Sequence, residues 1–321
     1  MAPLRHAVRL LCAVSLLVVL RASPPAVVLW HGMGDTCCDG LLAVKERIQA
    51  VMPGAHVHSV MLGSTLDQDE RQGFFGLVDE QLDSVCSCLS SDANLTDGFH
   101  AVGFSQGGLL LRGLVQRCPG VKVHTLVTMG SPHGGVVEVP GCPATANGLY
   151  CGQMRRLLDA GAYNKLIRGS VVQAQYFRDA KKLDLYLEHS AFLADVNNER
   201  EEKNEAYAQR LASLKKLVMV RFSNDTTVVP RDSAWFSMQN GDDLIPLRSS
   251  QLYSEDWLGL RQLDNEGALV MSEAPGVHMQ FSLQWFEDKV IRPYLTEPIT
   301  AAAAVTLEML GPDAKSAAAV A

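Results

Sequence analysis

A serine between two glycines is the part of this sequence best suited to covalent chemistry. The residues Gly103-Phe104-Ser105-Gln106-Gly107 form a G-x-S-x-G pattern, with an apolar run of strand length before it and a helical pattern after it. A serine between strand and helix lies on a sharp turn, which needs glycines because a Cβ there would crowd it. The pattern predicts a nucleophile and acyl transfer. A chance glycine pair around a surface serine is the alternative.

Two later residues suit the partners that such a serine needs. A serine hydroxyl is a poor nucleophile until a histidine accepts its proton, and a carboxylate must orient that histidine. In α/β hydrolases the chain order is serine, acid and histidine, each in a loop after a strand. Asp225 directly follows an expected strand, and His278 lies between a short apolar run and an expected last helix. The sequence therefore predicts Ser105, Asp225 and His278 as a catalytic triad.

Other residues of the same types fit these roles less well. Asp232 and Asp242 rival Asp225 but lie farther from the strand end. The alternative for Asp225 itself is a turn residue beside a glycan. His31 and His133 lie in glycine-rich loops that can shape a cleft. The remaining histidines lie in a leader, in expected strands where they pack or face solvent, or in a region of mixed pattern: His6, then His56, His58, His100 and His124, then His189.

Backbone N–H groups must stabilise the negative oxygen of a tetrahedral intermediate. In this kind of site one donor belongs to the residue after the nucleophile, and the other to a loop after an early strand. Gln106 is expected to be the first donor. The second is expected in the stretch His31-Gly32-Met33-Gly34-Asp35, where Met33 is the favoured donor. A plain glycine turn is the alternative for this stretch.

Strand-length apolar runs alternate with helical periodicity along most of the chain. Continuous apolar runs indicate strands covered on both faces, as in a parallel sheet, and their alternation with helices indicates an α/β fold. We therefore expect an α/β-hydrolase fold, with a mostly parallel central sheet flanked by helices. The expected strands are 26–30, 56–61, 99–104, 123–129, 217–222 and 268–271, and the expected helices are 44–52, 74–89, 108–115 and 279–290.

The alternation lapses between about residues 136 and 216. This stretch contains loops and scattered apolar pairs, such as Leu157-Leu158 and Tyr176-Phe177, without a regular strand pattern. We interpret it as a helical insertion over the cleft, within a catalytic domain that spans residues 24–298. We expect its apolar residues to form a groove, open to solvent, that holds the acyl chain. A small satellite core packed on the sheet is the alternative.

Both ends of the chain differ in composition from the rest. Arg5 and Arg9 precede an apolar stretch at 10–20, which is short for a bilayer span and typical of a signal peptide, here residues 1–23. Arg21 blurs the cleavage site, and an uncleaved anchor is the alternative. No other stretch approaches membrane-spanning length, so no span is expected after the signal is removed. The alanine-rich residues 299–321 predict a frayed or disordered tail.

Composition and charge limit the classes of function. The 321 residues are 47% hydrophobic and 20% charged, which excludes wholesale disorder. The net charge is −7 and no basic run occurs, so a nucleic-acid partner is not expected. Triad chemistry requires neither a metal nor an organic cofactor, and none is expected.

A secretory leader makes the cysteines and glycosylation motifs informative. Of the eight cysteines, Cys12 leaves with the leader and seven remain. An oxidising compartment would pair most of these seven, leaving one free. They lack the paired C-x-x-C and histidine spacing of a zinc site, which favours disulfides over metal. Motifs for N-linked glycans begin at Asn94 and Asn224 and agree with passage through the secretory pathway.

Collinear motifs over roughly residues 26–295 make the chain similar to the palmitoyl-protein thioesterases, lysosomal depalmitoylating enzymes, in their first-subfamily form. The matching segments are 31–35 with 37–38, 103–108, 116–119, 160–163, 192–195, 218–220, 224–225, 258–260 and His278. Two glycosylation sites typical of animal members are absent, because 188–190 and 204–206 do not fit the motif. The alanine-rich tail also lies outside the family pattern.

The resemblance implies the same triad and the same oxyanion donors, Met33 and Gln106. It implies hydrolysis of long-chain acyl thioesters, chiefly S-palmitoyl cysteine in proteins or peptides, in the lysosome, an equivalent compartment or outside the cell. An oxyester lipase or esterase with the same triad is one alternative, and an inactive lipid-binding protein of the same fold is another. The resemblance also implies three disulfides and one free thiol: Cys37–Cys38, Cys86–Cys118, Cys142–Cys151 and the free Cys88.

Overall fold

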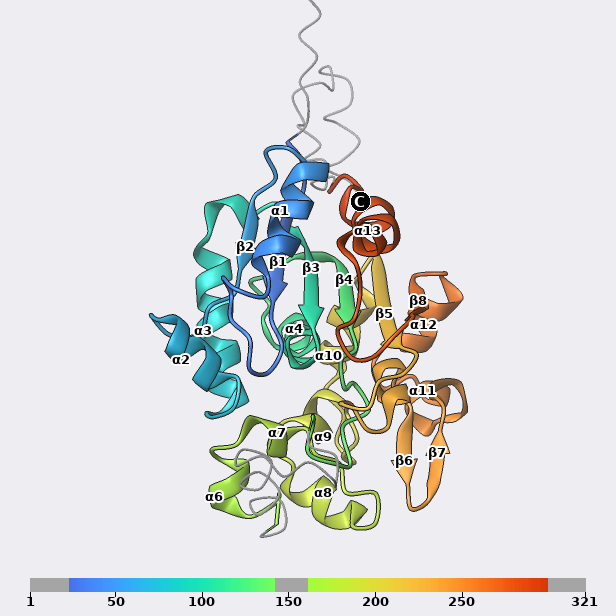
Figure 1. Cartoon of the computed structure of the whole chain (residues 1–321). Helices are drawn as coiled ribbons and strands as arrows, with labels where there is room; N and C mark the ends of the chain where they lie inside the picture. Colours follow the sequence, from blue (N-terminus) through green and yellow to red (C-terminus); the bar gives the residue numbers. More distant parts are fainter. Residues whose placement is uncertain (1–22, 142–160, 300–321) are drawn as a thin grey trace, which may run out of the picture.

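A parallel sheet of six strands forms the centre of the fold in a computed structural model that describes residues 23–141 and 161–299 (Figure 1). The strands are β1 (Ala26–Trp30), β2 (Val57–Ser59), β3 (Phe99–Phe104), β4 (Val123–Met129), β5 (Lys216–Phe222) and β8 (Leu269–Ala274). They lie in the order β2-β1-β3-β4-β5-β8, and all neighbours are parallel. The expected mostly parallel sheet is confirmed. A separate antiparallel hairpin pairs β6 (Met238–Asn240) with β7 (Asp243–Ile245).

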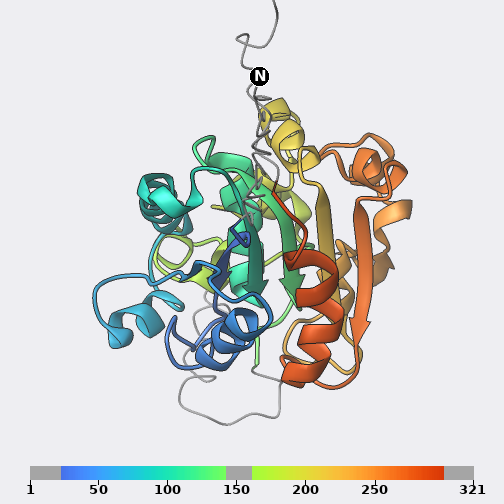
Figure 2. The same ribbon diagram turned by 90° about the horizontal axis from the view of Figure 1, so that it is seen from above.

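The strands are apolar on both faces because helices cover both. In β1, Val28 and Trp30 pack into one core, and Val27 and Leu29 pack into the other. Figure 2 shows the two helical layers on opposite sides of the sheet. The first core is covered by α3 (Val78–Ser91), α4 (Gln106–Arg117), α10 (Glu205–Ala212) and α12 (Leu260–Asn265). The second core is covered by α1 (Leu42–Val51), α13 (Leu283–Phe286) and the π-helical turn η4 (Glu287–Leu295).

The insertion lies beyond the carboxyl ends of the strands (Figure 1). Its short helices are α6 (Lys165–Arg168), α7 (Val172–Gln175), α8 (Leu183–His189) and α9 (Leu193–Val196). Phe192 and Leu193 are fully buried in the same core that α4 covers. Part of the insertion therefore packs on the domain, as the satellite-core alternative requires. Helix α10 also falls within the range 136–216, but it belongs to the layer that covers the sheet.

Several element boundaries differ from those expected. Strand β2 is shorter than 56–61, and α3 begins at Val78 rather than at 74, after Gly76 with its positive φ of 125°. The last helix begins at Leu283 rather than 279, because Met279 has a left-handed φ of 58° and Ser282 caps the first turn. Several short elements were not expected: α2 (Leu66–Gln72), α11 (Gln251–Ser254), η1 (Ala93–Leu95), η2 (Arg231–Trp235), η3 (Leu247–Ser249), α12 and the β6–β7 hairpin.

The Cys142–Cys151 bridge and nearly all of the predicted leader and tail lie outside the described residues. Within the described ranges, no helix is long and apolar enough to cross a bilayer. Disulfides join Cys37 to Cys38 and Cys86 to Cys118, and Cys88 is an exposed thiol. The side chains of the two predicted glycosylation sites, Asn94 and Asn224, are exposed.

We predict that Ile48→Ala in α1 destabilises the fold by about 3 kcal/mol, because it leaves a cavity in the core between α1 and η4. Ile48 is fully buried there, whereas Glu46 on the same helix is exposed. Urea unfolding followed by circular dichroism should measure this loss, and Glu46→Ala should stay within about 0.5 kcal/mol of the unchanged protein. Equal stability of the two variants would show that α1 is not packed on the sheet.

Candidate active site

Ser105 lies on a strained turn between β3 and α4. Its backbone has φ 51° and ψ −123°, a region that residues with a side chain rarely adopt. A Cβ at Gly107 would lie 2.4 Å from the carbonyl oxygen of Trp30, and a Cβ at Gly103 would lie 2.3 Å from the Cα of Gly108. Both glycines of the pattern are therefore required by close backbone approach. The turn holds the serine hydroxyl at the carboxyl ends of the strands.

Ser105, His278 and Asp225 form a continuous hydrogen-bonded relay. His278 Nε2 lies 2.9 Å from Ser105 Oγ, and His278 Nδ1 lies 2.6 Å from Asp225 Oδ2. The other carboxylate oxygen of Asp225 accepts hydrogen bonds from the backbone N–H groups of Thr227 at 2.8 Å and Val228 at 3.0 Å. The carboxylate can only accept, so Nδ1 carries the proton and Nε2 is left to accept the serine proton.

Two neighbouring loops hold the acid and the base in place. Asp225 follows β5, and His278 follows β8, which is paired with β5 in the sheet. The loops bind each other, because Asn224 N–H donates to the Gly276 carbonyl at 2.9 Å and Gly276 N–H donates to Ser223 Oγ at 3.1 Å. The relay geometry therefore rests on the sheet and on two hydrogen bonds between these loops.

The rival residues have other partners. Asp232 forms an ion pair with Arg221, and Asp242 is exposed in the turn of the β6–β7 hairpin. His133 is fully buried, where it accepts a hydrogen bond from Arg112 Nε at 3.2 Å. Burial first, and then the charge of Arg112, hold the pKa of His133 well below its usual value. His133 therefore remains neutral and supports the loop after β4.

The predicted oxyanion donors flank the serine. Gln106 is the first residue of α4, so its backbone N–H has no carbonyl partner within the helix. The loop that contains Met33 passes close to the serine, because a Cβ added at Gly32 would lie 3.1 Å from Ser105 Cβ. Met33 and Gly32 also line the same cavity as Ser105. The N-terminus of α4 adds a positive partial charge at this point.

The side chain of Gln106 connects the nucleophile turn to the insertion. Its Oε1 accepts hydrogen bonds from Gln173 Nε2 at 3.0 Å and from the Tyr176 hydroxyl at 3.0 Å. Its Nε2 donates to the Gly73 carbonyl at 2.9 Å, and Gln173 donates to the same carbonyl. The insertion is therefore fixed directly beside the first turn of α4.

A second, buried histidine–aspartate pair supports the loop with Met33. His31 Nε2 lies 3.0 Å from Asp69 Oδ1, and His31 Nδ1 lies 2.8 Å from the Gly32 carbonyl. Asp69 also accepts hydrogen bonds from the backbone N–H groups of Cys37 and Leu62. Both nitrogens of His31 face atoms that only accept, so both bonds form together only in the imidazolium.

The two partners shift each other's pKa in opposite directions. Burial is the largest single effect and disfavours the charged form of each, but their mutual hydrogen bond, the backbone hydrogen bonds and their opposite charges together outweigh it. The pKa of His31 is raised with further help from the Gly32 carbonyl, and the pKa of Asp69 is lowered with further help from two backbone N–H groups. Sequence reasoning missed Asp69, because it stands in the polar run Leu66–Gln72 that is typical of a solvated helix.

A cavity of about 230 Å³ borders Ser105 and His278. None of the described residues of the insertion lines it. Its wall combines apolar side chains with a polar rim: Gly32, Met33, Asp35, Gly40, Leu41, Val44, Phe104, Thr227, Met279 and Phe281. The predicted acyl groove in the insertion stays a prediction, since residues 142–160 lie outside the described part of the chain.

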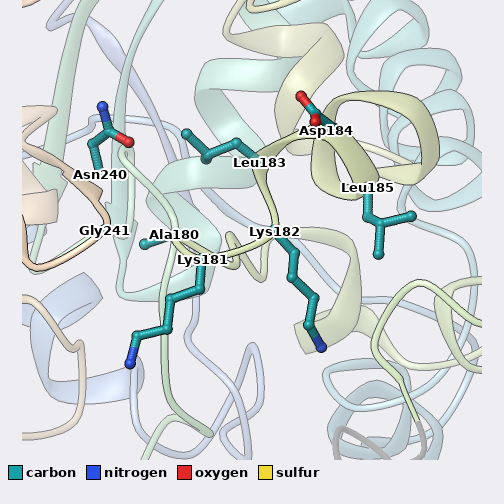
Figure 3. Close-up of a pocket in the computed structure, with 8 residues that line it drawn as sticks. All are labelled: Ala180, Lys181, Lys182, Leu183, Asp184, Leu185, Asn240 and Gly241. Carbon is teal, nitrogen blue, oxygen red and sulfur yellow. The ribbon is translucent and has the colours of Figure 1, made fainter.

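Another hollow, between the insertion and the β6–β7 turn, is separate from the relay (Figure 3). It is wide, at about 570 Å³, and Figure 3 shows the side chains of Lys181 and Lys182 extending away from Leu183 and Asn240. Gly241 N–H donates to the Ala180 carbonyl and holds the two sides together. None of the predicted site residues lines this hollow.

The parallel sheet with its two helical layers and the serine turn after β3 define an α/β hydrolase. A family profile described as Palmitoyl protein thioesterase matches residues 26–278. The chain therefore belongs to the palmitoyl protein thioesterase family, and it is a thioester hydrolase. The predicted family and enzyme class are confirmed.

Several thioesterases from other organisms resemble the chain over most of its length. Palmitoyl-protein thioesterase 1 of Caenorhabditis elegans is 39% identical over 273 residues, which cover 84% of this chain and 91% of the relative. Palmitoyl-protein thioesterase 3 of Dictyostelium discoideum is 31% identical over 290 residues, covering 89% and 95%. The Lysosomal thioesterase PPT2 homolog of Drosophila melanogaster is 28% identical over 306 residues, covering 90% and 97%.

We predict that Asp69→Asn lowers stability by about 3 kcal/mol at pH 5, because it leaves a buried charge without its partner. Because the folded protein raises the pKa of His31, this residue contributes its full share to the free energy of unfolding below the ordinary histidine pKa of 6.5. That share is lost as the pH rises through the raised pKa of the folded protein. The lowered pKa of Asp69 makes its contribution complete above 3.8. The deficit should therefore be largest near pH 5 and smaller at pH 8.5.

Urea unfolding at both pH values measures this deficit. Asp67→Asn is the matched control, because Asp67 is an exposed carboxylate on the same helix. A deficit that grows between pH 5 and pH 8.5 would contradict the assignment of a charged pair.

Proposed function

We propose that the protein hydrolyses long-chain acyl thioesters, chiefly S-palmitoyl cysteine in proteins or peptides, through an acyl-enzyme on Ser105. The observation that carries this proposal is the relay from Ser105 Oγ through His278 to the buried carboxylate of Asp225. The names of the relatives support the palmitoyl substrate. The relay supports serine chemistry, since it supplies a base at hydrogen-bond distance from the hydroxyl.

In the first half-reaction, Ser105 Oγ attacks the thioester carbonyl while His278 Nε2 takes its proton. Asp225 holds the Nδ1 proton and stabilises the imidazolium that forms. The tetrahedral intermediate collapses, the carbon–sulfur bond breaks, and the leaving cysteine thiolate takes the proton from His278, which becomes neutral again. In the second half-reaction, His278 removes a proton from water, which attacks the acyl-serine. The bond between the acyl carbon and Ser105 Oγ then breaks, Oγ takes back the proton from His278, and the fatty acid is released.

The oxyanion of each intermediate binds the backbone N–H groups of Met33 and Gln106 in this proposal. Two features support it: the position of Gln106 at the N-terminus of α4, and the close contact of the Gly32 loop with Ser105. The buried pair His31–Asp69 keeps that loop in place. Donors held in this way need no reorganisation when negative charge develops.

The acyl chain extends toward the insertion in this proposal, and the cysteine side occupies the cavity beside Ser105. The cavity, at about 230 Å³, is smaller than most ligand pockets and carries the polar groups of Asp35 and Thr227, which suit a peptide. Hydrogen bonds from Gln173 and Tyr176 fix the insertion beside Gln106, one residue from the nucleophile.

The proposed location is the lysosome, an equivalent compartment or the cell exterior. The predicted leader, the two disulfides and the exposed glycosylation motifs at Asn94 and Asn224 support passage through the secretory pathway. The Drosophila relative carries the word lysosomal in its name. We also propose that the site is complete without a metal ion or an organic cofactor.

We predict that Ser105→Ala lowers kcat for palmitoyl-cysteine peptide by about 10⁴-fold to 10⁶-fold without unfolding the protein, because the nucleophile is lost. Ser87→Ala is the control, since Ser87 is an exposed serine on α3. A fluorophosphonate should label the unchanged protein and the control, but not Ser105→Ala. Activity above about a tenth in Ser105→Ala would require another nucleophile.

The same assay separates a thioesterase from an oxyester lipase. Matched palmitoyl thioester and oxyester substrates should show the higher kcat/KM for the thioester, and the reverse order would assign the site to ester lipids. Absence of both turnover and fluorophosphonate labelling would instead favour an inactive lipid-binding protein.

We predict that kcat/KM rises with acyl length by up to about fourfold per methylene and levels off near palmitate, because each buried methylene contributes about 0.8 kcal/mol. The measurement uses acyl thioesters below their micelle concentrations. Val44→Ala is the control, because Val44 lines the cavity beside Ser105 and not the insertion. This change should leave the increase in kcat/KM per methylene unchanged. A flat profile would contradict a long-chain site, and a slope lost in Val44→Ala would place the chain in the cavity.

A further inference from the structure

Three side chains with metal-ligating atoms meet at the edge strand β2, outside the site described above. His56, His58 and Asp92 place one ligand atom each within 4.8 Å of one another. His56 Nε2 lies 2.9 Å from Asp92 Oδ2, and His58 Nδ1 lies 3.6 Å from the same oxygen. Within residues 23–141 and 161–299, no other group of three such side chains comes this close. Neither the relay nor the oxyanion donors use these residues.

Local structure brings the three together. His56 directly precedes β2 and His58 lies within it, two residues further on, so both side chains project to the same side, while Val57 between them is buried on the other side. Asp92 ends α3, and its Oδ1 accepts hydrogen bonds from the backbone and side-chain N–H groups of Asn94, both at 2.9 Å. These bonds fix the carboxylate and leave Oδ2 facing both imidazoles.

The distances and the ligand types suit zinc. Zn²⁺ binds imidazole nitrogen and carboxylate oxygen at about 2.0–2.2 Å, so ligands of a tetrahedral ion are about 3.4 Å apart. The observed separations of 2.9 and 3.6 Å bracket that value. The three side chains are 36%, 23% and 18% exposed, which leaves room for water at the fourth position. Asn94 supplies the outer hydrogen bonds that commonly orient a metal-bound carboxylate.

We propose that His56, His58 and Asp92 form a binding site for a divalent transition-metal ion of the zinc class. The ion would join the edge strand β2 to the end of α3, two elements that are otherwise held at this point by the His–Asp contacts. Because the ligands converge only in the folded chain, the bound ion stabilises the native state by mass action. A metal-free ion pair between the histidines and Asp92 is the competing arrangement.

The positive charge of Lys45 lies near the proposed site and offers a further test of it. Lys45, on α1, repels a positive charge on His58, as His56 also does, whereas Asp92 attracts it. A bound cation experiences the same repulsion from the Lys45 ammonium. Removing that charge should therefore tighten metal binding, whereas it would have no such effect if the ion bound elsewhere.

Isothermal titration of the tag-free, metal-stripped protein with ZnCl₂ at pH 7.5 tests the proposal. One equivalent should bind, and His58→Gln and Asp92→Asn should each weaken binding by at least about tenfold. Asn retains the capacity to cap η1, so Asp92→Asn removes the anionic ligand and keeps the local fold. His189→Gln, at a partly exposed histidine on α8, is the matched control and should bind as the unchanged protein does. Lys45→Gln should bind several-fold more tightly.

Thermal unfolding supplies a second readout. Zn²⁺ should raise the Tm of the unchanged protein and of His189→Gln, but not that of His58→Gln. Thioester hydrolysis by all variants should remain unchanged, which verifies that each has folded. Absence of Zn²⁺ binding at 100 μM, or equal binding by the unchanged protein, His58→Gln and Asp92→Asn, would overturn the proposal and leave the metal-free ion pair.

Discussion

The close approach of the β3–α4 turn to the end of β1 is the constraint on which the site depends. Gly107 lies against the carbonyl groups of Trp30 and His31 with no room for a Cβ. Ser105 N–H donates to the Met129 carbonyl at 2.7 Å, which fixes the turn to β4 as well. These contacts hold the serine in its strained conformation. They also bring the loop after β1 beside the serine, so one packing constraint positions both the nucleophile and the expected oxyanion donors.

The order of the sheet then determines where the relay partners lie. In a parallel sheet every strand ends at the same edge, so residues after β3, β5 and β8 can meet although they are far apart in sequence. β5 and β8 are neighbours, and the contacts of Gly276 with Ser223 and Asn224 join their loops. β4 separates this pair from β3, and His278, which follows β8, reaches past the ends of β5 and β4 to Ser105. Loop length after β8 is therefore a geometric requirement of the site.

The sequence predicts most of the sheet, because strands covered on both faces are continuous apolar runs. It also indicated Ser105, Asp225 and His278, which the structure brings together, since each follows a recognisable strand. It could not indicate Asp69, whose burial depends on where α2 packs, nor the contacts of Gln106 with Gln173 and Tyr176, which depend on the path of the insertion. The β6–β7 hairpin and α11 could not be predicted for another reason: elements of three or four residues are too short to show a hydrophobic periodicity.

The two histidine–aspartate pairs show how surroundings, rather than residue type, decide a role. In both pairs, one ring nitrogen of the histidine forms a hydrogen bond with a carboxylate oxygen, at 2.6 Å for His278 and 3.0 Å for His31. The second nitrogen of His278 faces the Ser105 hydroxyl, which can donate, so the neutral ring is satisfied and can accept a proton. The second nitrogen of His31 faces a carbonyl, which cannot donate, so that ring is satisfied only when charged. The first arrangement suits a base, whereas the second favours the charged ring and suits support of the loop beside it.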